Sequence, residues 1–172
     1  STPSSTLFPY TTLFRSEHEL VAATEQLDTD EIADLAPDLP REVMQDVFKS
    51  LSPEEREQLR SAMSYPEDTV GALMDFDMIS IRDDITVEIV LRYLRRLDEM
   101  PDHTDQLFVV DYAGRLKGLL PVNRLLVTDP ETPVATVMQP EFIKFHPQEK
   151  AQDAANAFER YDLVSAPVVD EG

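Results

Sequence analysis

The hydrophobic positions between residues 27 and 64 recur every twelve residues. Leu27, Leu39, Leu51 and Met63 occupy one phase of this period, and Leu35, Val47 and Leu59 occupy another. Twelve residues accommodate one short helix and the turn to the next, so the pattern predicts a stack of short helices with a leucine on each inner face. An ordinary amphipathic helical bundle shares most of these features and stays open as the alternative.

The residues expected at helix ends follow the same period. Ser52 suits a helix N-cap, Pro53 suits the first helical position, and acids in the next two positions favour the positive end of the helix dipole. Residues 28–31, Asp-Thr-Asp-Glu, open the preceding unit in the same manner. We therefore expect residues 17–64 to form an all-α superhelical domain.

A second repeat, with an offset of 64 residues, covers the rest of the chain. Residues 73–81 align with residues 137–145; each segment ends in an expected strand, at 78–81 and 142–145, and leads into a helical pattern. The apolar face of the first helix is expected at Val87, Val90, Leu91 and Leu94, and that of the second at Ala151, Ala154, Ala155 and Phe158. The repeat predicts two copies of one structural unit.

Each helix is followed by a buried strand that ends in Val-Val-Asp, at residues 107–111 and 166–170. In the first copy a turn at 112–115 leads to a further strand at 116–120 and a short helix at 122–126. The unit therefore reads β-α-β-turn-β-α, and the fold class of the whole chain is predicted to be α+β. The second copy stops at the turn, so we expect it to be truncated.

Residues 1–16 differ from the remainder in composition. Half of them are Ser or Thr, none is acidic, and Arg15 is the one charged residue. A secretory signal would have a positive start and a continuous apolar stretch, and neither is present. The segment resembles a translated sequencing adapter, so it is expected to be a non-native leader, and the chain as a whole is expected to be a fragment.

The tandem unit resembles a pair of CBS domains, on the pattern of a strand, Val-Val-Asp, a glycine turn and Gly-hydrophobic-hydrophobic. Residues 65–74, YPEDTVGALM, join the helical repeats to this pair, as in the cytoplasmic half of the MgtE family of magnesium channels and transporters. Residues 125–138 and 161–163 are similar to that family too. The resemblance divides the chain into a partial helical domain at 17–64, a first CBS repeat at 65–128 and a second at 129–172.

Several expectations follow from this resemblance alone. The family forms homodimers, here expected through the CBS helices, and a transmembrane pore domain of five helices follows the CBS pair and is absent from this sequence. Cytosolic magnesium closes the pore. The region would then lie at the cytoplasmic face of the cell membrane.

The charge of the chain fits a cation-responsive role. Thirty-four acidic residues against fifteen basic ones give a net charge of −19, which argues against a nucleic-acid partner or an anionic lipid surface. There is no cysteine, so thiolate zinc sites and disulfides are excluded. We hypothesise that acidic faces of the helical domain and the second CBS repeat approach each other when Mg²⁺, the expected cofactor, neutralises them.

The resemblance places the metal ligands near a helix start in the N-terminal domain and on the helix of the second CBS repeat. The first region carries Asp28, Asp30, Glu31 and Asp34, and the second carries Glu149, Asp153, Glu159 and Asp162. Lys150 and Gln152 stand where the family has acids, so their acidic neighbours are taken as stand-ins. The selected metal-binding residues are Asp30, Asp34, Asp153, Glu159 and Asp162. A solvated helix face or a helix cap is the alternative role for any one of them.

CBS pairs often bind adenine nucleotides through a Gly-h-h-[Ser/Thr]-x-x-Asp motif. Residues 118–124 have Pro121 at the hydroxyl position and Arg124 at the acid position, which counts against this site. Where nucleotide-binding members stack a base on aromatic rings, the chain offers Gln106 and Leu163. Weak ATP binding, and with it a nucleotide-sensing CBS module, stays open as the alternative function.

An enzymatic role is not expected from the sequence. His18, His103 and His146 are widely separated and lack the spacing of a zinc site, and no nucleophile elbow or P-loop is present. A regulatory appendage of an enzyme is a third alternative. The sequence thus predicts a non-enzymatic regulatory region.

Overall fold

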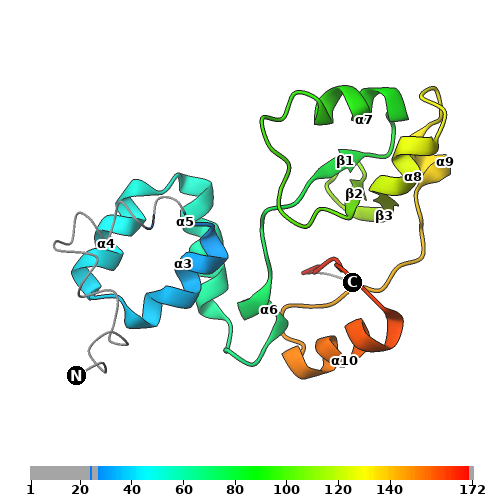
Figure 1. The fold of residues 1–172 in the computed structure, drawn as a ribbon. Coiled ribbons are helices and arrows are strands. Elements are labelled where there is room, and N and C mark those ends of the chain that lie inside the picture. The colour runs from blue at the N-terminus through cyan, green and yellow to red at the C-terminus, as the bar shows by residue number, and fades with distance from the viewer. Residues whose placement is uncertain (1–23, 25–26, 171–172) are drawn as a thin grey trace, which may run out of the picture. The chain divides into compact units, whose positions relative to one another are not determined.

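The computed structural model describes Thr24 and residues 27–170, and the chain divides after Pro66 into two compact units (Figure 1). The leader expected at residues 1–16 lies outside the described residues. None of the described helices combines the length and the apolar character needed to cross a membrane. The second unit begins at Glu67 and contains both CBS-like repeats.

The first unit consists of short helices spaced by the predicted period. Helix α3 spans Thr29–Leu35, α4 spans Arg41–Ser50 and α5 spans Pro53–Ser64, with one 3₁₀ turn, η2 at Ala36–Asp38, after α3. The three α-helices begin at positions 29, 41 and 53, so the twelve-residue period is confirmed as the spacing of helix starts. A capping box explains why α5 begins at Pro53. The Glu55 backbone N–H donates to Ser52 Oγ at 3.2 Å, and the Ser52 N–H donates to Glu55 Oε2 at 2.7 Å.

Among the described residues, the core of this unit comes from the inner faces of α3, α4 and α5 and from the residue that follows α4. Its buried members are Ile32, Val43, Val47, Leu51 and Leu59. Leu27 and Leu39 pack against them half-buried, as their phase predicts. Met63 is 47% exposed, so its predicted place on the inner face was wrong: Ala62 is the buried residue in the last turn of α5.

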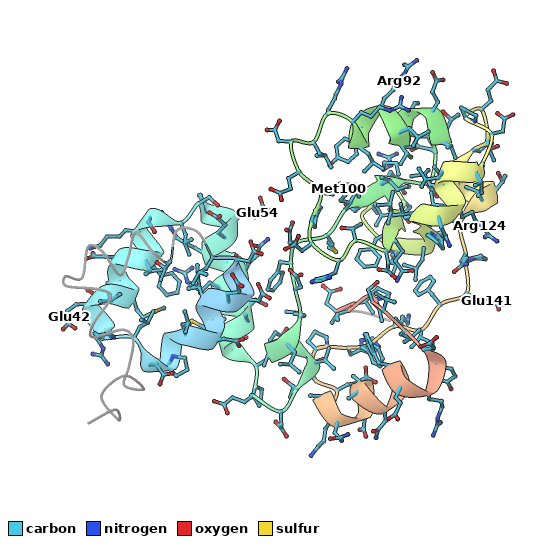
Figure 2. The ribbon with its side chains drawn as sticks, viewed as in Figure 1. Glu42, Glu54, Arg92, Met100, Arg124 and Glu141 are labelled. Carbon is cyan, nitrogen blue, oxygen red and sulfur yellow. The ribbon has the colours of Figure 1, made fainter. Side chains whose placement is uncertain are left out.

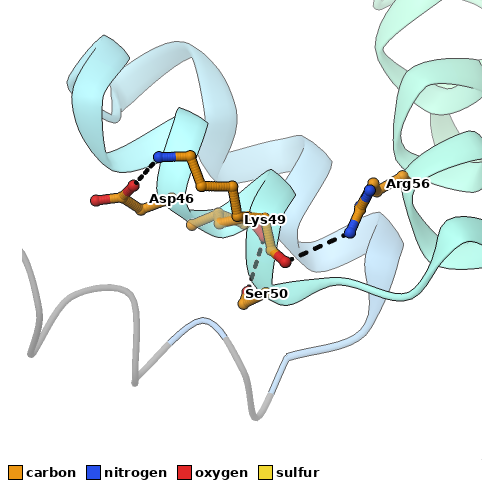
Figure 3. Close-up of polar contacts among 5 residues, drawn as sticks. Asp46, Lys49, Ser50 and Arg56 are labelled. Atoms are coloured by element: carbon orange, nitrogen blue, oxygen red, sulfur yellow. Dashed lines mark hydrogen bonds and ion pairs between the residues drawn. The ribbon is translucent and has the colours of Figure 1, made fainter.

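The turn between α4 and α5 is closed by polar groups at the end of α4 (Figure 3). Arg56 Nε donates to the carbonyl of Leu51 at 3.0 Å, and its Nη2 donates to the carbonyl of Lys49 at 3.4 Å. Ser50 Oγ donates to the carbonyl of Val47 at 2.8 Å. The last carbonyls of a helix lack partners within the helix, so these bonds satisfy α4 and fix the direction in which α5 begins.

The first CBS repeat follows the predicted order of elements. Strand β1 spans Ser80–Arg82, α7 Val87–Leu94, β2 Gln106–Val110, β3 Leu116–Pro121 and α8 Val122–Val127. The sheet order is β1-β2-β3, with β1 parallel to β2, where Ile81 lies opposite Val109, and β2 antiparallel to β3, where Phe108 lies opposite Leu119. A parallel pair needs a crossover, which α7 provides.

One apolar cluster fills the space between this sheet and its helices. Its buried residues are Ile79, Ile81, Val87, Val90, Leu107, Val109, Leu120, Leu125 and Val134. Leu91 and Leu94 pack against the cluster half-buried, so the predicted apolar face of α7 is confirmed. Val134 belongs to the second repeat in sequence, which shows that the core of the first repeat is not built from that repeat alone.

The second repeat contains α10, at Ala151–Tyr161, and its residues up to 170, which the structure describes, form no regular strand. The predicted strands at 142–145 and 166–170 are reduced to a single parallel bridge between Phe145 and Val168, and Ala155 on the predicted apolar face is exposed. In the first repeat β2 is held by two neighbours, β1 and β3, whereas in the described part of the second repeat the equivalent segment is bridged at Val168 to Phe145. The core here is the stacked pair of Phe145 and Phe158, with ring centroids 5.9 Å apart.

The two repeats exchange the short helices that begin them. Helix α6, at Val70–Leu73, packs with α10 of the second repeat, and the Val70 N–H donates to the Glu149 carbonyl at 2.8 Å (Figure 1). Helix α9, at Val134–Val137, makes the equivalent bond to the first repeat, from the Val134 N–H to the Ile85 carbonyl at 2.8 Å. Both bonds join residues related by the offset of 64, so the exchange is reciprocal.

Candidate functional site

The acids before and at the start of α3 serve partly as helix caps. Asp28 is the N-cap residue and forms a capping box with Glu31, whose Oε2 accepts the Asp28 backbone N–H at 3.0 Å. The acid pair therefore satisfies backbone donors that α3 leaves without a partner. Of the four acids considered in this region, these two have a structural role that accounts for them.

Asp30 and Asp34 are one helical turn apart on α3. Asp34 is exposed, whereas Asp30 is half-buried. Two acids at i and i+4 are neighbours on a helix surface and repel each other by a few tenths of a kcal/mol. The pair therefore forms a small negative surface on the first unit.

On the second unit, the predicted acids lie along α10 and at its two ends. Asp153 is exposed in the first turn and Glu159 is exposed near the end. Glu149 precedes the helix and is already engaged, because its Oε2 accepts the His146 backbone N–H at 2.6 Å. Among the described residues, no hydrogen bond or ion pair occupies the carboxylates of Asp153 and Glu159.

Asp162 ends α10 in a left-handed backbone conformation. It is the C-cap residue, with φ 53° and ψ 48°. Only glycine, asparagine and aspartate adopt this region readily, which explains why a short polar residue ends the helix here. The side chain is exposed, so its carboxylate is accessible to solvent and to ions.

The structure does not gather these acids into a preformed metal site. Asp30 and Asp34 lie in the first unit, and Asp153, Glu159 and Asp162 lie in the second. Across Thr24 and residues 27–170, no three His, Asp or Glu side chains are close enough together to hold a metal ion. Magnesium can be held by one or two carboxylates while it keeps several waters, so exposed single acids and pairs are compatible with such binding.

The residues that replace the nucleotide motif have structural contacts of their own. Pro121 is the N-cap residue of α8. Arg124, whose side chain is labelled in Figure 2, donates from Nη1 to the Val137 carbonyl at the end of α9, at 3.2 Å. Gly118 lies in β3 directly against Gln139. Arg124 thus joins the first repeat to the exchanged helix, a role that its sequence position did not indicate.

A polar cluster between the two repeats was missed by the sequence analysis. Ser165 Oγ donates to Asp105 Oδ1 at 2.5 Å, and Gln106 Nε2 donates to Ser165 Oγ at 2.9 Å and to the Ser165 carbonyl at 3.2 Å. All three residues are half-buried. A signal was present, because Gln106 and Ser165 stand at the same distance before the Val-Val-Asp of their repeats.

Comparison with known families accounts for nearly the whole chain. The profile of the MgtE intracellular N domain matches residues 15–68, and the profile of the CBS domain matches residues 70–131 and 134–172. The chain belongs to the MgtE family. It contains the N domain and the CBS domains of that family in the order that the sequence analysis inferred from residues 65–74.

Named MgtE proteins are similar to this chain over much of its length. The magnesium transporter MgtE of Thermus thermophilus is 37% identical over 121 residues, which cover 70% of this chain and 27% of that protein. The MgtE of Bacillus subtilis is 26% identical over 149 residues, which cover 87% of this chain and 33% of that protein. The chain therefore spans between a quarter and a third of the length of these relatives.

Two solved structures, one of a magnesium channel and one of a magnesium transporter, have the same fold. The cytosolic domain of the Mg²⁺ channel MgtE, crystallised in complex with ATP, superposes with a TM-score of 0.82 and 32% identity over 94% of this chain and 66% of that one. The soluble part of a magnesium transporter gives a TM-score of 0.81 and 25% identity over 90% of this chain and 60% of that one. The relatives are transporters and channels rather than enzymes, in agreement with the non-enzymatic interpretation.

Proposed function

We propose that this chain is the magnesium-sensing cytosolic region of a magnesium channel or transporter. The observation that carries the proposal is the MgtE N domain followed by CBS domains in one acidic chain. In this proposal, Mg²⁺ neutralises acidic faces on the helical unit and on α10, and the neutralised faces favour the closed state. Asp30 and Asp34 belong to one face, and Asp153, Glu159 and Asp162 belong to the other.

The magnitude of the electrostatic effect is sufficient. Two carboxylates about 6 Å apart at an effective dielectric constant of about 20 repel each other by roughly 3 kcal/mol. Moving a two-state equilibrium from mostly open to mostly closed needs about 5.5 kcal/mol of differential binding. Two neutralised contacts would provide this, so weak binding by exposed acids is enough for a sensor of cellular magnesium.

Asp162→Asn is the sharpest test of this role. Asparagine tolerates the left-handed backbone at this position, so the variant removes the charge and keeps the helix end. In small-angle X-ray scattering, we expect millimolar Mg²⁺ to reduce the radius of gyration of the wild-type chain. The magnesium midpoint of Asp162→Asn should be higher by about tenfold if the carboxylate contributes about 1.4 kcal/mol.

Two controls accompany the scattering experiment. Sodium chloride at matched ionic strength separates specific neutralisation from general screening. Glu131→Gln changes an exposed acid in the loop between α8 and α9, away from α10, and should keep the wild-type midpoint. Identical scattering with and without Mg²⁺ in the wild-type chain would contradict the proposal.

Adenine-nucleotide sensing is the second candidate function, because a similar MgtE cytosolic domain has been crystallised with ATP. In this chain, Pro121 replaces the hydroxyl of the nucleotide motif, and Arg124 is bonded to the Val137 carbonyl. We expect ATP binding to be weak for these reasons. Isothermal titration with Mg²⁺ and, separately, with ATP distinguishes the two candidates, since strong heat with ATP alone favours the second.

The proposal includes a homodimer at the cytoplasmic face of a membrane, with the pore domain supplied by the rest of the protein. Large apolar side chains are exposed on the CBS helices: Ile89 and Tyr93 on α7 are each 46% exposed, and Leu126 and Val127 on α8 are 70% and 85% exposed. Exposed apolar groups of this size are typical of protein interfaces. Sedimentation velocity on the chain tests the dimer.

A further inference from the structure

Three hydrogen bonds join Asp105 and Gln106 of the first repeat to Ser165 of the second. The Ser165 hydroxyl donates its hydrogen to Asp105 Oδ1 and accepts one from Gln106 Nε2. The second amide hydrogen of Gln106 is directed to the Ser165 carbonyl. Because a backbone carbonyl only accepts, this bond also fixes which end of the Gln106 amide faces the second repeat.

This cluster, called the inter-repeat clasp below, joins equivalent positions of the two CBS repeats. Gln106 is the first residue of β2 and lies three residues before the Val-Val-Asp of the first repeat. Ser165 lies three residues before the Val-Val-Asp of the second repeat. The Asp105 backbone carbonyl also accepts the N–H of Val122, the first residue of α8, at 3.0 Å. The clasp is therefore anchored in the first repeat, through Gln106 in the central strand β2 and through the bond of Asp105 to the start of α8.

The clasp holds the end of the turn that carries Asp162. Helix α10 closes at Asp162, and the Leu163 N–H donates to the Phe158 carbonyl at 3.0 Å. Between this bond and Ser165 lies Val164, which is 71% exposed. The turn 162–165 is thus fixed at one end by the helix cap and at the other by the clasp.

We propose that Asp105, Gln106 and Ser165 are positioning residues that hold the turn 162–165 and thereby present the Asp162 carboxylate for magnesium-dependent closing. This inference rests on the proposed function. The clasp binds no metal itself: it fixes where the first repeat places the end of α10. Loss of the clasp leaves Asp162 chemically intact on a turn that moves, so the ion would have to order the turn as well as neutralise the charge.

The test uses Ser165→Ala, which removes the hydroxyl that donates to Asp105 and accepts from Gln106. In hydrogen exchange without magnesium, amides 162–166 should exchange roughly tenfold faster than in the wild-type chain, as expected for loss of a side-chain hydrogen-bond network. The magnesium midpoint in scattering should rise by at least a few fold. Ser165→Thr keeps the hydroxyl and should restore both quantities.

Two further variants keep the test decisive. Gln106→Ala removes the amide from the other repeat and should reproduce both changes, whereas Ser80→Ala, at an exposed position of β1, should reproduce neither. An unchanged magnesium midpoint in Ser165→Ala and Gln106→Ala, with a normal wild-type response, overturns the clasp and leaves the proposed function standing. Absence of any magnesium response in the wild-type chain overturns the proposed function itself, and the clasp's role with it.

Discussion

Gly118 lies in β3 directly against the backbone of residue 139, which belongs to the second repeat. A Cβ at this position would be 2.8 Å from the Gln139 carbonyl oxygen and 2.8 Å from Met138 Sδ. The two backbones are also paired, since the Gln139 N–H donates to the Leu119 carbonyl at 2.7 Å and the Leu119 N–H donates to the Gln139 carbonyl at 2.9 Å. Glycine is required here by the close approach of two backbones.

We expect Gly118→Ala to destabilise the CBS unit by about 1–3 kcal/mol, because the atom that the new methyl group meets is backbone and has no rotamer to escape into. Chemical denaturation followed by tyrosine fluorescence measures this loss. Ala113→Gly, at an exposed position of the turn after β2, is a matched control expected to change stability by less than 1 kcal/mol. A stability of Gly118→Ala equal to that of the wild type would show that the Gln139 segment can move away.

Individual acids show where residue-level prediction succeeds. The Asp28 and Glu31 caps follow from an acid pair three residues apart at a helix start, and a spacing of three also links His146 to the Glu149 that accepts its N–H. The left-handed conformation of Asp162 did not follow from its sequence, because aspartate is common in every kind of turn. Its place at a helix end depends on where α10 stops.

At the scale of the helix, α5 combines a cap with a titrating group. The side-chain hydrogen bond with Ser52 and the bond to the Ser52 backbone lower the pKa of Glu55 below its usual value of 4.5. Because the pKa of Glu55 is lower in the folded state than in the unfolded state, the hydrogen bond stabilises the helical unit at pH values above the unfolded pKa. This contribution is lost as the pH falls through the folded pKa.

Ser52→Ala should therefore return the pKa of Glu55 toward 4.5 and destabilise the helical unit by about 1 kcal/mol at neutral pH, the usual effect of losing an N-cap. A carboxyl titration followed by NMR measures the pKa, and thermal unfolding measures the stability. Ser61→Ala, inside the same helix, should leave the pKa of Glu55 unchanged. A Glu55 pKa that is equally low in Ser52→Ala would show that the Ser52 hydroxyl does not lower it and would leave the Ser52 backbone N–H as the cause.

Helices and strands were predicted best where their formation depends on residues within the element itself. The starts of α3 and α5 were predictable because cap residues and the hydrophobic period agree there, and the start of α4 followed from the period of twelve. The strands expected at 142–145 and 166–170 did not form a ladder, because a strand depends on partners that its own alternation of residues does not reveal. The clasp was missed for the same reason.

At the scale of the whole molecule, the exchange of α6 and α9 makes each repeat depend on the other. Val134 is fully buried in the core of the first repeat, although it follows that repeat in sequence. The repeat pattern could not reveal this, since an offset of 64 residues identifies equivalent segments without saying which copy each segment packs against. The sequence therefore predicted that two copies exist, but it did not predict that each copy packs against a helix of the other.

We expect Val134→Ala to lower the free energy of unfolding of the CBS unit by about 2 kcal/mol, as for other truncations of buried aliphatic side chains. Hydrogen exchange should become faster in α7 and in β1 to β3, and should stay unchanged in α3 to α5. Val127→Ala, at a site that is 85% exposed, should change stability by less than about 0.5 kcal/mol. Faster exchange confined to α10 would contradict the assignment of α9 to the first repeat.

The exchanged helices also determine the order in which the protein is completed on the ribosome. The core of the first repeat stays open until Val134 has been synthesised, and α6 has no partner until Glu149 follows it by about 80 residues. At roughly 5–20 residues per second, the newly made α6 segment waits on the order of 4–16 s for its partner. The helical unit makes its described core contacts among residues 27–59 and does not wait. Synthesis therefore yields a folded N domain first, with buried Val70 of the next segment exposed to chaperones in the interval.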